Sequence, residues 1–99
     1  MADWFVYIVK CKNNTLYTGI TIDVERRLEE HRGEEGKGAK YLRGKGPLKL
    51  VFQERVGSKS NASKIEMKIK RLSRLKKIQI LQGNLKVLEL IPEESFEEE

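Results

Sequence analysis

Three side chains suited to phosphodiester chemistry lie close together in the segment 17–31. Tyr17 belongs to a predicted strand, and Arg27 and the chain's single histidine, His31, are four residues apart, so they project from one face of the helix that follows. A guanidinium can bind a phosphate through two parallel hydrogen bonds, while a phenol and an imidazole can orient water or move its proton. On these residues alone, an ordinary strand and surface helix is the favoured interpretation. It leaves the other charged residues of the helix simply solvated: Glu25, Arg26, Glu29 and Glu30.

One carboxylate stands out in the second half of the chain. Glu66 is the only acidic residue between Lys59 and Lys77, and it lies beside the apolar stripe of a predicted helix. A single carboxylate can hold one Mg²⁺ that otherwise keeps its waters and binds a phosphate oxygen. The ordinary alternative is an ion pair between Glu66 and Lys70, four residues on, worth about 0.2–0.5 kcal/mol.

The elements that must position these residues begin with a hairpin. Trp4–Lys10 and Leu16–Thr21 are rich in aromatic and β-branched residues and predict two strands joined by the turn Cys11–Thr15. A two-residue turn at Asn13 and Asn14 would put Tyr7 and Tyr17 on opposite faces of the sheet. A three-residue turn closed by a left-handed Asn would pair Tyr7 with Gly19 and put both tyrosines on one face. The sequence leaves both registers open, and a functional site requires the second.

Local signals mark the remaining elements. Asp23 can cap a helix that runs to Arg32, and the glycine-rich segment GEEGKGAKYLRGKGP then forms a connection that can include a helical turn over Ala39–Leu42. Leu48–Val56 predicts a third strand, with Leu48, Leu50 and Phe52 on one side. Ser60 or Asn61 can cap a helix to about Arg74, whose core stripe has helical spacing: Ala62, Ile65, Ile69 and Leu72. A last helix over Lys76–Gln82 ends at Gly83 and Asn84, and an extended segment over Leu85–Ile91 follows.

Length and composition limit the protein class. Its 99 residues fit one domain, and the single cysteine, Cys11, excludes an internal disulfide and a cysteine-based metal cluster. The N-terminus has too short an apolar run for a membrane span and lacks the basic lead of a signal peptide. These features favour a cytoplasmic protein without membrane association or a small-molecule cofactor.

Charge is distributed very unevenly along the chain. Residues 37–78 contain fourteen Lys or Arg against two acids, Glu54 and Glu66, while residues 89–99 contain six glutamates and no basic residue. A dense basic block favours a polyanion, most often nucleic acid, as the partner. The acidic C-terminus has too little apolar content to fold. We therefore expect a domain at 1–88 and a flexible acidic tail at 89–99 that could screen the basic block.

Four motifs in order resemble the GIY-YIG nuclease superfamily. They are Phe5–Tyr7, Tyr17–Gly19, Asp23–His31 with its Arg27, and Ala62–Lys70 with its Glu66. Any one motif is weak, but the ordered set is specific and covers residues 4–85. The segment GKGAKYLRGKGP makes the chain most similar to the small single-domain bacterial members. The resemblance implies a three-stranded antiparallel sheet flanked by helices and metal-dependent cleavage of phosphodiesters in DNA.

The resemblance also implies roles for individual residues. It makes Tyr7 and Tyr17 the motif tyrosines, Arg27 the helix arginine, His31 an active-site histidine and Glu66 the ligand of one Mg²⁺ or Mn²⁺. Tyr7 is then the expected general base, although the sequence does not choose between it and Tyr17. Deprotonating a phenol of pKa near 10 at neutral pH costs about 4 kcal/mol. Arg27 and the metal must lower this cost, or His31 must take the proton.

Further residues are expected to contact nucleic acid. They are Gly19, Lys40, Tyr41, Arg43, Lys68, Lys70, Arg71 and Asn84. Two positions depart from the family pattern, because Phe5 replaces the first motif's glycine and Leu85 follows Asn84 where relatives often have proline. The expected function is a monomeric DNA endonuclease, structure-selective and acting in repair or recombination, with RNA as the alternative substrate. The competing functions are a nucleic-acid-binding module that has lost turnover and a protein whose basic block binds an acidic partner.

Overall fold

A three-stranded antiparallel sheet organises the protein. The computed structural model describes residues 3–33, 42 and 46–90. The elements are, in chain order, β1 (Trp4–Lys10), β2 (Leu16–Thr21), α1 (Val24–Arg32), β3 (Lys49–Gly57), α2 (Lys59–Arg71), α3 (Arg74–Leu81) and the 3-10 helix η2 (Val87–Leu90). The strand order is β2-β1-β3, with β1 in the centre. The predicted α+β fold, a three-stranded antiparallel sheet flanked by helices, is confirmed.

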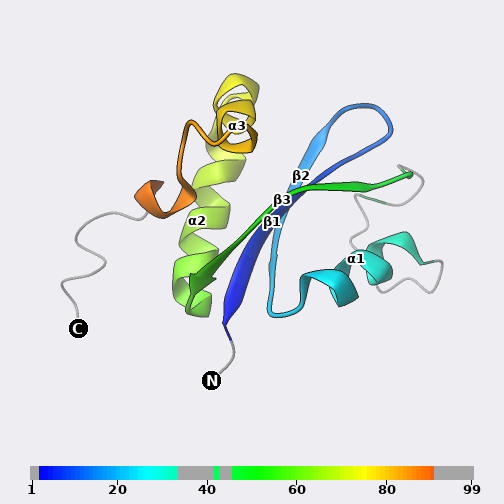
Figure 1. Cartoon of the computed structure of the whole chain (residues 1–99), viewed down its shortest axis with the longest axis horizontal. Coiled ribbons are helices and arrows are strands. Elements are labelled where there is room, and N and C mark those ends of the chain that lie inside the picture. Colours follow the sequence, from blue (N-terminus) through cyan, green and yellow to red (C-terminus); the bar gives the residue numbers. More distant parts are fainter. Residues whose placement is uncertain (1–2, 34–41, 43–45, 91–99) are drawn as a thin grey trace.

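Helices cover both faces of the sheet, with α2 on one side and α1 on the other (Figure 1). Because side chains alternate along a strand, β1 supplies both hydrophobic cores. The core under α2 is built mainly from aliphatic side chains: Val6, Ile8, Ala62, Ile65, Ile69, Ile80 and Val87. The core under α1 includes a tyrosine and a cysteine among its apolar side chains: Tyr7, Val9, Cys11, Val24, Leu28, Leu42 and Leu48. Tyr7 therefore lies on the face that α1 covers.

Serine and aspartate caps set where the helices begin. Asp23 caps α1 as predicted, since its carboxylate accepts from the Arg26 backbone N–H at 3.2 Å. The predicted cap of α2 at Ser60 or Asn61 is wrong, because Ser58 accepts from the Asn61 N–H at 3.1 Å and the helix begins at Lys59. The same helix ends at Arg71 rather than near Arg74, because Ser73 caps α3 there.

A bulge in β3 makes the side-chain pattern of that strand differ from the prediction. Ile8 pairs with Phe52 and Val9 pairs with Leu50, so Val51 is an extra residue between these pairs. Leu50 consequently packs in the core under α1, and Phe52 packs in the core under α2. The prediction that Leu48, Leu50 and Phe52 share one side is therefore wrong for Phe52.

The C-terminal elements also differ from their predictions. The last helix begins at Arg74, two residues before the predicted start, and ends next to Gly83, whose φ is +80°. Residues 87–90 form η2 and not an extended segment, because Val87 is fully buried in the core under α2. Most of the predicted acidic tail and of the turn at 39–42 lies outside the described residues.

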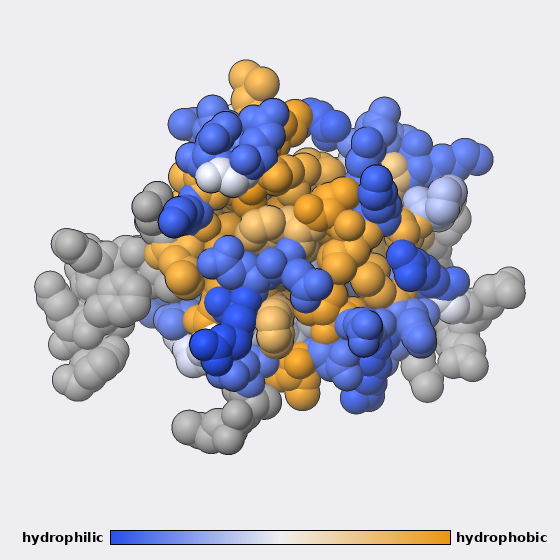
Figure 2. Space-filling model, in the orientation of Figure 1, coloured by the Kyte–Doolittle hydropathy of each residue, from blue (hydrophilic) through white to orange (hydrophobic). Residues whose placement is uncertain are grey.

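The surface in Figure 2 has apolar residues across its middle and hydrophilic residues toward its rim. Of the helices in the described ranges, none has the length and apolar character that crossing a membrane would require.

Candidate active site

The hairpin register brings the two strand tyrosines to one face. Tyr7 pairs with Gly19 and Val9 pairs with Tyr17, so Tyr7 and Tyr17 both point toward α1. The turn is the three-residue alternative. Its Cys11 N–H donates to the Thr15 carbonyl at 2.9 Å, and Asn14 adopts a φ of 67°, in the left-handed region. The register that a functional site requires is confirmed.

Gly19 gives Tyr7 the space that its ring occupies. A Cβ on Gly19 would lie 2.5 Å from Tyr7 Cζ and still nearer the phenol oxygen. Carbon atoms in ordinary contact are about 3.5–4.0 Å apart, so only glycine fits beneath this ring. The predicted nucleic-acid contact of Gly19 stays a prediction, but its packing role is evident from the structure.

His31 meets Tyr7 inside this packed face. The Tyr7 hydroxyl and His31 Nε2 are 2.8 Å apart, and both residues are buried, with 1% and 7% of their surface exposed. The ring of Tyr17 stands edge-on to His31 at a centroid distance of 5.7 Å. Val24 and Leu28 anchor α1 on the sheet, which holds His31 against β1 and β2. Residues from three elements thus enclose one polar cluster.

The environment of this cluster favours uncharged forms of its two central groups. The pKa of Tyr7 is raised to about 12, chiefly by burial and then by Tyr17 and the charge of Glu66, while Arg27 opposes the shift. The pKa of His31 is lowered to about 4, chiefly by burial and then by the Arg27 charge, against the opposing charge of Glu30. At neutral pH the pair is therefore a phenol beside a neutral imidazole.

Arg27 connects this pair to the protein surface. Its guanidinium lies close enough to the Tyr7 phenol to oppose the rise in the pKa of that group, and its Nη1 donates to Glu30 Oε1 at 2.8 Å. The direction of the hydrogen bond between Tyr7 and His31 depends on the imidazole tautomer: Nε2 accepts from the Tyr7 O–H when the imidazole proton is on Nδ1.

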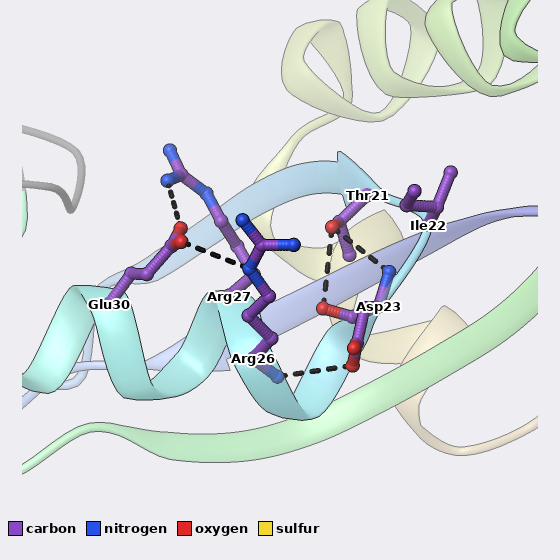
Figure 3. A pocket seen from close by; sticks show the side chains of 6 residues that line it. All are labelled: Thr21, Ile22, Asp23, Arg26, Arg27 and Glu30. Atoms are coloured by element: carbon purple, nitrogen blue, oxygen red, sulfur yellow. Dashed lines mark hydrogen bonds and ion pairs between the residues drawn. The ribbon is translucent and has the colours of Figure 1, made fainter.

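The interpretation of Glu30 as simply solvated is wrong. Its side chain is 22% exposed, and its two oxygens contact Arg27 at 2.8 Å and Arg26 at 3.4 Å. Figure 3 shows this carboxylate between the two arginine side chains, in a pocket of about 210 Å³ near the start of α1. The spacing of Glu30, three and four residues after two arginines, was the signal that could have identified it.

Glu66 comes from α2, which packs against β2 as well as β1. The predicted ion pair exists, with Lys70 Nζ 3.3 Å from Glu66 Oε2, and the Glu66 side chain is 22% exposed. Its charge nevertheless contributes to the raised pKa of Tyr7, so the carboxylate lies within electrostatic range of the phenol. An ion pair with an exposed lysine is worth at most about 1 kcal/mol, so Glu66 remains accessible to a competing cation.

The donor set fits a weakly bound, largely hydrated divalent ion. Within the described ranges, no three His, Cys, Asp or Glu side chains gather closely enough to enclose a metal. One accessible carboxylate, here Glu66, is instead typical of Mg²⁺ sites that the substrate phosphate completes.

The other predicted contact residues lie in three places. Lys68, Lys70 and Arg71 are exposed on α2. Asn84 is exposed beyond α3, where its side-chain amide donates to Gln82 Oε1 at 3.4 Å. The remaining three lie outside the described residues: Lys40, Tyr41 and Arg43.

Comparisons with known proteins give this arrangement a family. Residues 3–79 match the GIY-YIG catalytic domain. The UPF0213 protein of Cronobacter sakazakii is 51% identical over 85 residues, which cover 86% of this chain and 87% of that protein. The solution NMR structure of the UPF0213 protein BH0048 from Bacillus halodurans is 46% identical, with a TM-score of 0.54 over 82% of this chain and 84% of that one. The NMR structure of the E. faecalis protein EF2693 is 34% identical, with a TM-score of 0.59 over 84% and 86%.

Proposed function

This chain belongs to the GIY-YIG family, whose catalytic domain indicates a nuclease, and we propose that it is a metal-dependent endonuclease that hydrolyses phosphodiester bonds in DNA. The observation that carries the proposal is the 2.8 Å hydrogen bond between the Tyr7 hydroxyl and His31 Nε2, with the Arg27 charge close enough to act on the same phenol. A hydroxyl held between a cation and a neutral imidazole is arranged for proton transfer.

In the proposed reaction, Tyr7 relays a proton and does not act as a standing phenolate. With a pKa of about 12, the phenol is ionised in roughly one molecule in 10⁵ at pH 7. The oxygen of the attacking water forms a bond to phosphorus as its proton passes to the Tyr7 oxygen and the Tyr7 proton passes to His31 Nε2. The P–O bond to the leaving sugar oxygen breaks, and that oxygen takes a proton from solvent water. The hydrogen bond to His31 supports Tyr7 as the base, with Tyr17 orienting water beside the imidazole.

Arg27 and a divalent ion stabilise charge in this proposal. The guanidinium, already beside the phenol, binds a non-bridging oxygen of the phosphate and stabilises the charge that develops there. One Mg²⁺ or Mn²⁺ held by Glu66 would neutralise phosphate charge when bound. The ion would replace Lys70 at the Glu66 carboxylate, which is feasible because the ion pair with this exposed lysine is weak.

The exposed cations of α2 support a nucleic-acid substrate. Lys68, Lys70 and Arg71 occupy the last turn of the same helix that carries Glu66. Lys70 shares the face of Glu66 and the other two lie farther round the helix, so this end of α2 offers positive charge to a phosphate backbone. Electrostatic contacts of this kind do not read base sequence. We therefore propose a structure-selective enzyme of repair or recombination. It acts as a cytoplasmic monomer whose domain extends through η2 to Leu90 and is followed by the acidic tail.

The test uses nicked, branched and single-stranded DNA and matched RNA, with Mg²⁺, Mn²⁺ or EDTA. We expect wild-type protein to cut DNA only with a metal, and Glu66→Gln to bind DNA with unchanged affinity but without cutting. Glu54→Gln, a glutamate of β3, is the matched control and should cut normally. Tight binding without cleavage by the wild type would refute the enzyme and favour a binding module. Absence of both would favour an acidic protein partner for the basic block.

A further inference from the structure

A carboxylate at a position that the Asp23–His31 motif leaves unspecified contacts the arginine of the proposed site. Glu30 lies one turn along α1 from Arg27, and each of its oxygens contacts a different guanidinium (Figure 3). Arg27 Nη1 is 2.8 Å from Oε1, whereas Arg26 Nε is 3.4 Å from Oε2. The shorter contact is therefore the one with the arginine that also reaches Tyr7.

Burial distinguishes this contact from an ordinary surface ion pair. The side chains of Glu30 and Arg27 are 22% and 31% exposed, whereas that of Arg26 is 74% exposed. Side chains that are partly enclosed lose less conformational freedom when they pair, so the Arg27 contact defines a single orientation better than the Arg26 contact does. Arg26 instead occupies the second oxygen and limits rotation of the carboxylate.

We propose that Glu30 is a positioning residue that holds the Arg27 guanidinium in the orientation that serves both Tyr7 and the substrate phosphate. The inference rests on the proposed nuclease function. Glu30 contacts Arg27, the Arg27 charge acts on Tyr7, and Tyr7 contacts His31, so the surface carboxylate is linked to the buried proton-transfer pair. A guanidinium has five N–H donors in a rigid fork, and fixing one edge on Glu30 sets the direction of the others.

This role predicts opposite effects on rate and on substrate binding. Without the Glu30 charge, Arg27 loses its fixed edge and the transition state loses an aligned cation. The same change makes the pocket more positive and thereby favours a polyanion. Glu30→Gln should therefore lower kcat about 10-fold, with KM unchanged or reduced.

The kinetic test compares three variants on the DNA substrate that the wild type cuts. Glu29→Gln is the matched control, because this exposed neighbour on α1 carries the same charge, and it should keep the wild-type kcat. Glu30→Asp keeps the charge but shortens the side chain by one methylene, so it should resemble Glu30→Gln. Full activity of Glu30→Asp would show that charge and not position matters and would overturn the proposal. A rise in KM without a fall in kcat would also overturn it.

A second measurement does not depend on cleavage. NMR relaxation of the Arg27 Nε–Hε group in the full chain without DNA should show restricted motion in wild type and Glu29→Gln, and increased motion in Glu30→Gln. Equal order parameters in all three would refute the positioning role, even for an active nuclease. If Arg27 becomes more mobile in Glu30→Gln but the wild type cuts no substrate, the proposed nuclease function is refuted. The conclusion that Glu30 restrains Arg27 in the wild type still stands. Thermal melting of each variant establishes that it is folded.

Discussion

Gly19→Ala tests whether the position of the Tyr7 ring creates the proton-transfer pair. The substitution adds a single methyl group on β2, at a residue whose backbone is extended strand and needs no special conformation. The added Cβ would lie 2.5 Å from Tyr7 Cζ, about 1 Å inside the closest ordinary carbon contact. The phenol is the group that must move, because the ring is in the direct path of the methyl group.

The size of the effect follows from that displacement. Moving the phenol by about 1 Å lengthens its 2.8 Å contact with His31 beyond hydrogen-bonding distance. A misplacement of this size costs about 100-fold in rate. Overpacking a buried ring costs about 1–3 kcal/mol in the free energy of unfolding, so the domain is destabilised but is expected to fold.

The assay measures kcat for DNA cleavage, urea unfolding and the ¹⁵N shift of His31 Nε2 at pH 7. Gly46→Ala is the matched control, since among the described residues the atom nearest to its Cβ is Leu48 N, 4.0 Å away, and Gly46 is exposed. We expect Gly19→Ala alone to lose activity and to change the Nε2 shift. If Gly19→Ala keeps both the wild-type Nε2 shift and the wild-type kcat, β2 has moved in place of the ring and the reasoning is refuted.

Three further predictions follow from the fold and its charges. Because the pKa of His31 is about 4 in the folded protein and near 6.5 when unfolded, the unfolded chain binds more protons between these values, so the free energy of unfolding should fall by about 2–3 kcal/mol from pH 6.5 to pH 4. His31→Gln should flatten urea-derived stability over that range, and an unchanged slope would contradict the assignment. Ser58→Ala should cost about 1 kcal/mol by thermal unfolding, whereas Ser60→Ala, at the position predicted from sequence, should cost only a few tenths. Lys68→Glu with Arg71→Glu should weaken DNA binding and reduce its salt dependence in fluorescence anisotropy titrations, and equal affinity would remove α2 from the binding surface.

The predictions from sequence succeeded where the signal is local or where several motifs agree. Asp23 marks the start of α1 because its side chain bonds a backbone N–H only three residues away. The ordered motifs, with Tyr7, Arg27 and Glu66 in separate segments, indicated the family and with it the three-stranded sheet. The start of α2 could not be predicted in this way, because Ser58 and Ser60 are two residues apart and either can cap a helix. The folded structure uses Ser58.

Tertiary structure decided whether the residues of the site can meet. The Asn13 and Asn14 turn was compatible with two registers, and the left-handed conformation of Asn14 in the folded hairpin puts Tyr7 and Tyr17 on one face. Strand alternation also failed to predict the bulge at Val51, because a bulge depends on pairing with β1.

The sequence therefore identified the phenol and the imidazole of the candidate site, but it did not determine their pKa values. Tyr7 has a raised pKa and His31 a lowered one because the fold buries both against α1 and brings Arg27 and Glu66 within electrostatic range. The spacing of Glu30 likewise permits contact with two arginines, but only the folded structure makes its contact with Arg27 the shorter and less exposed of the two.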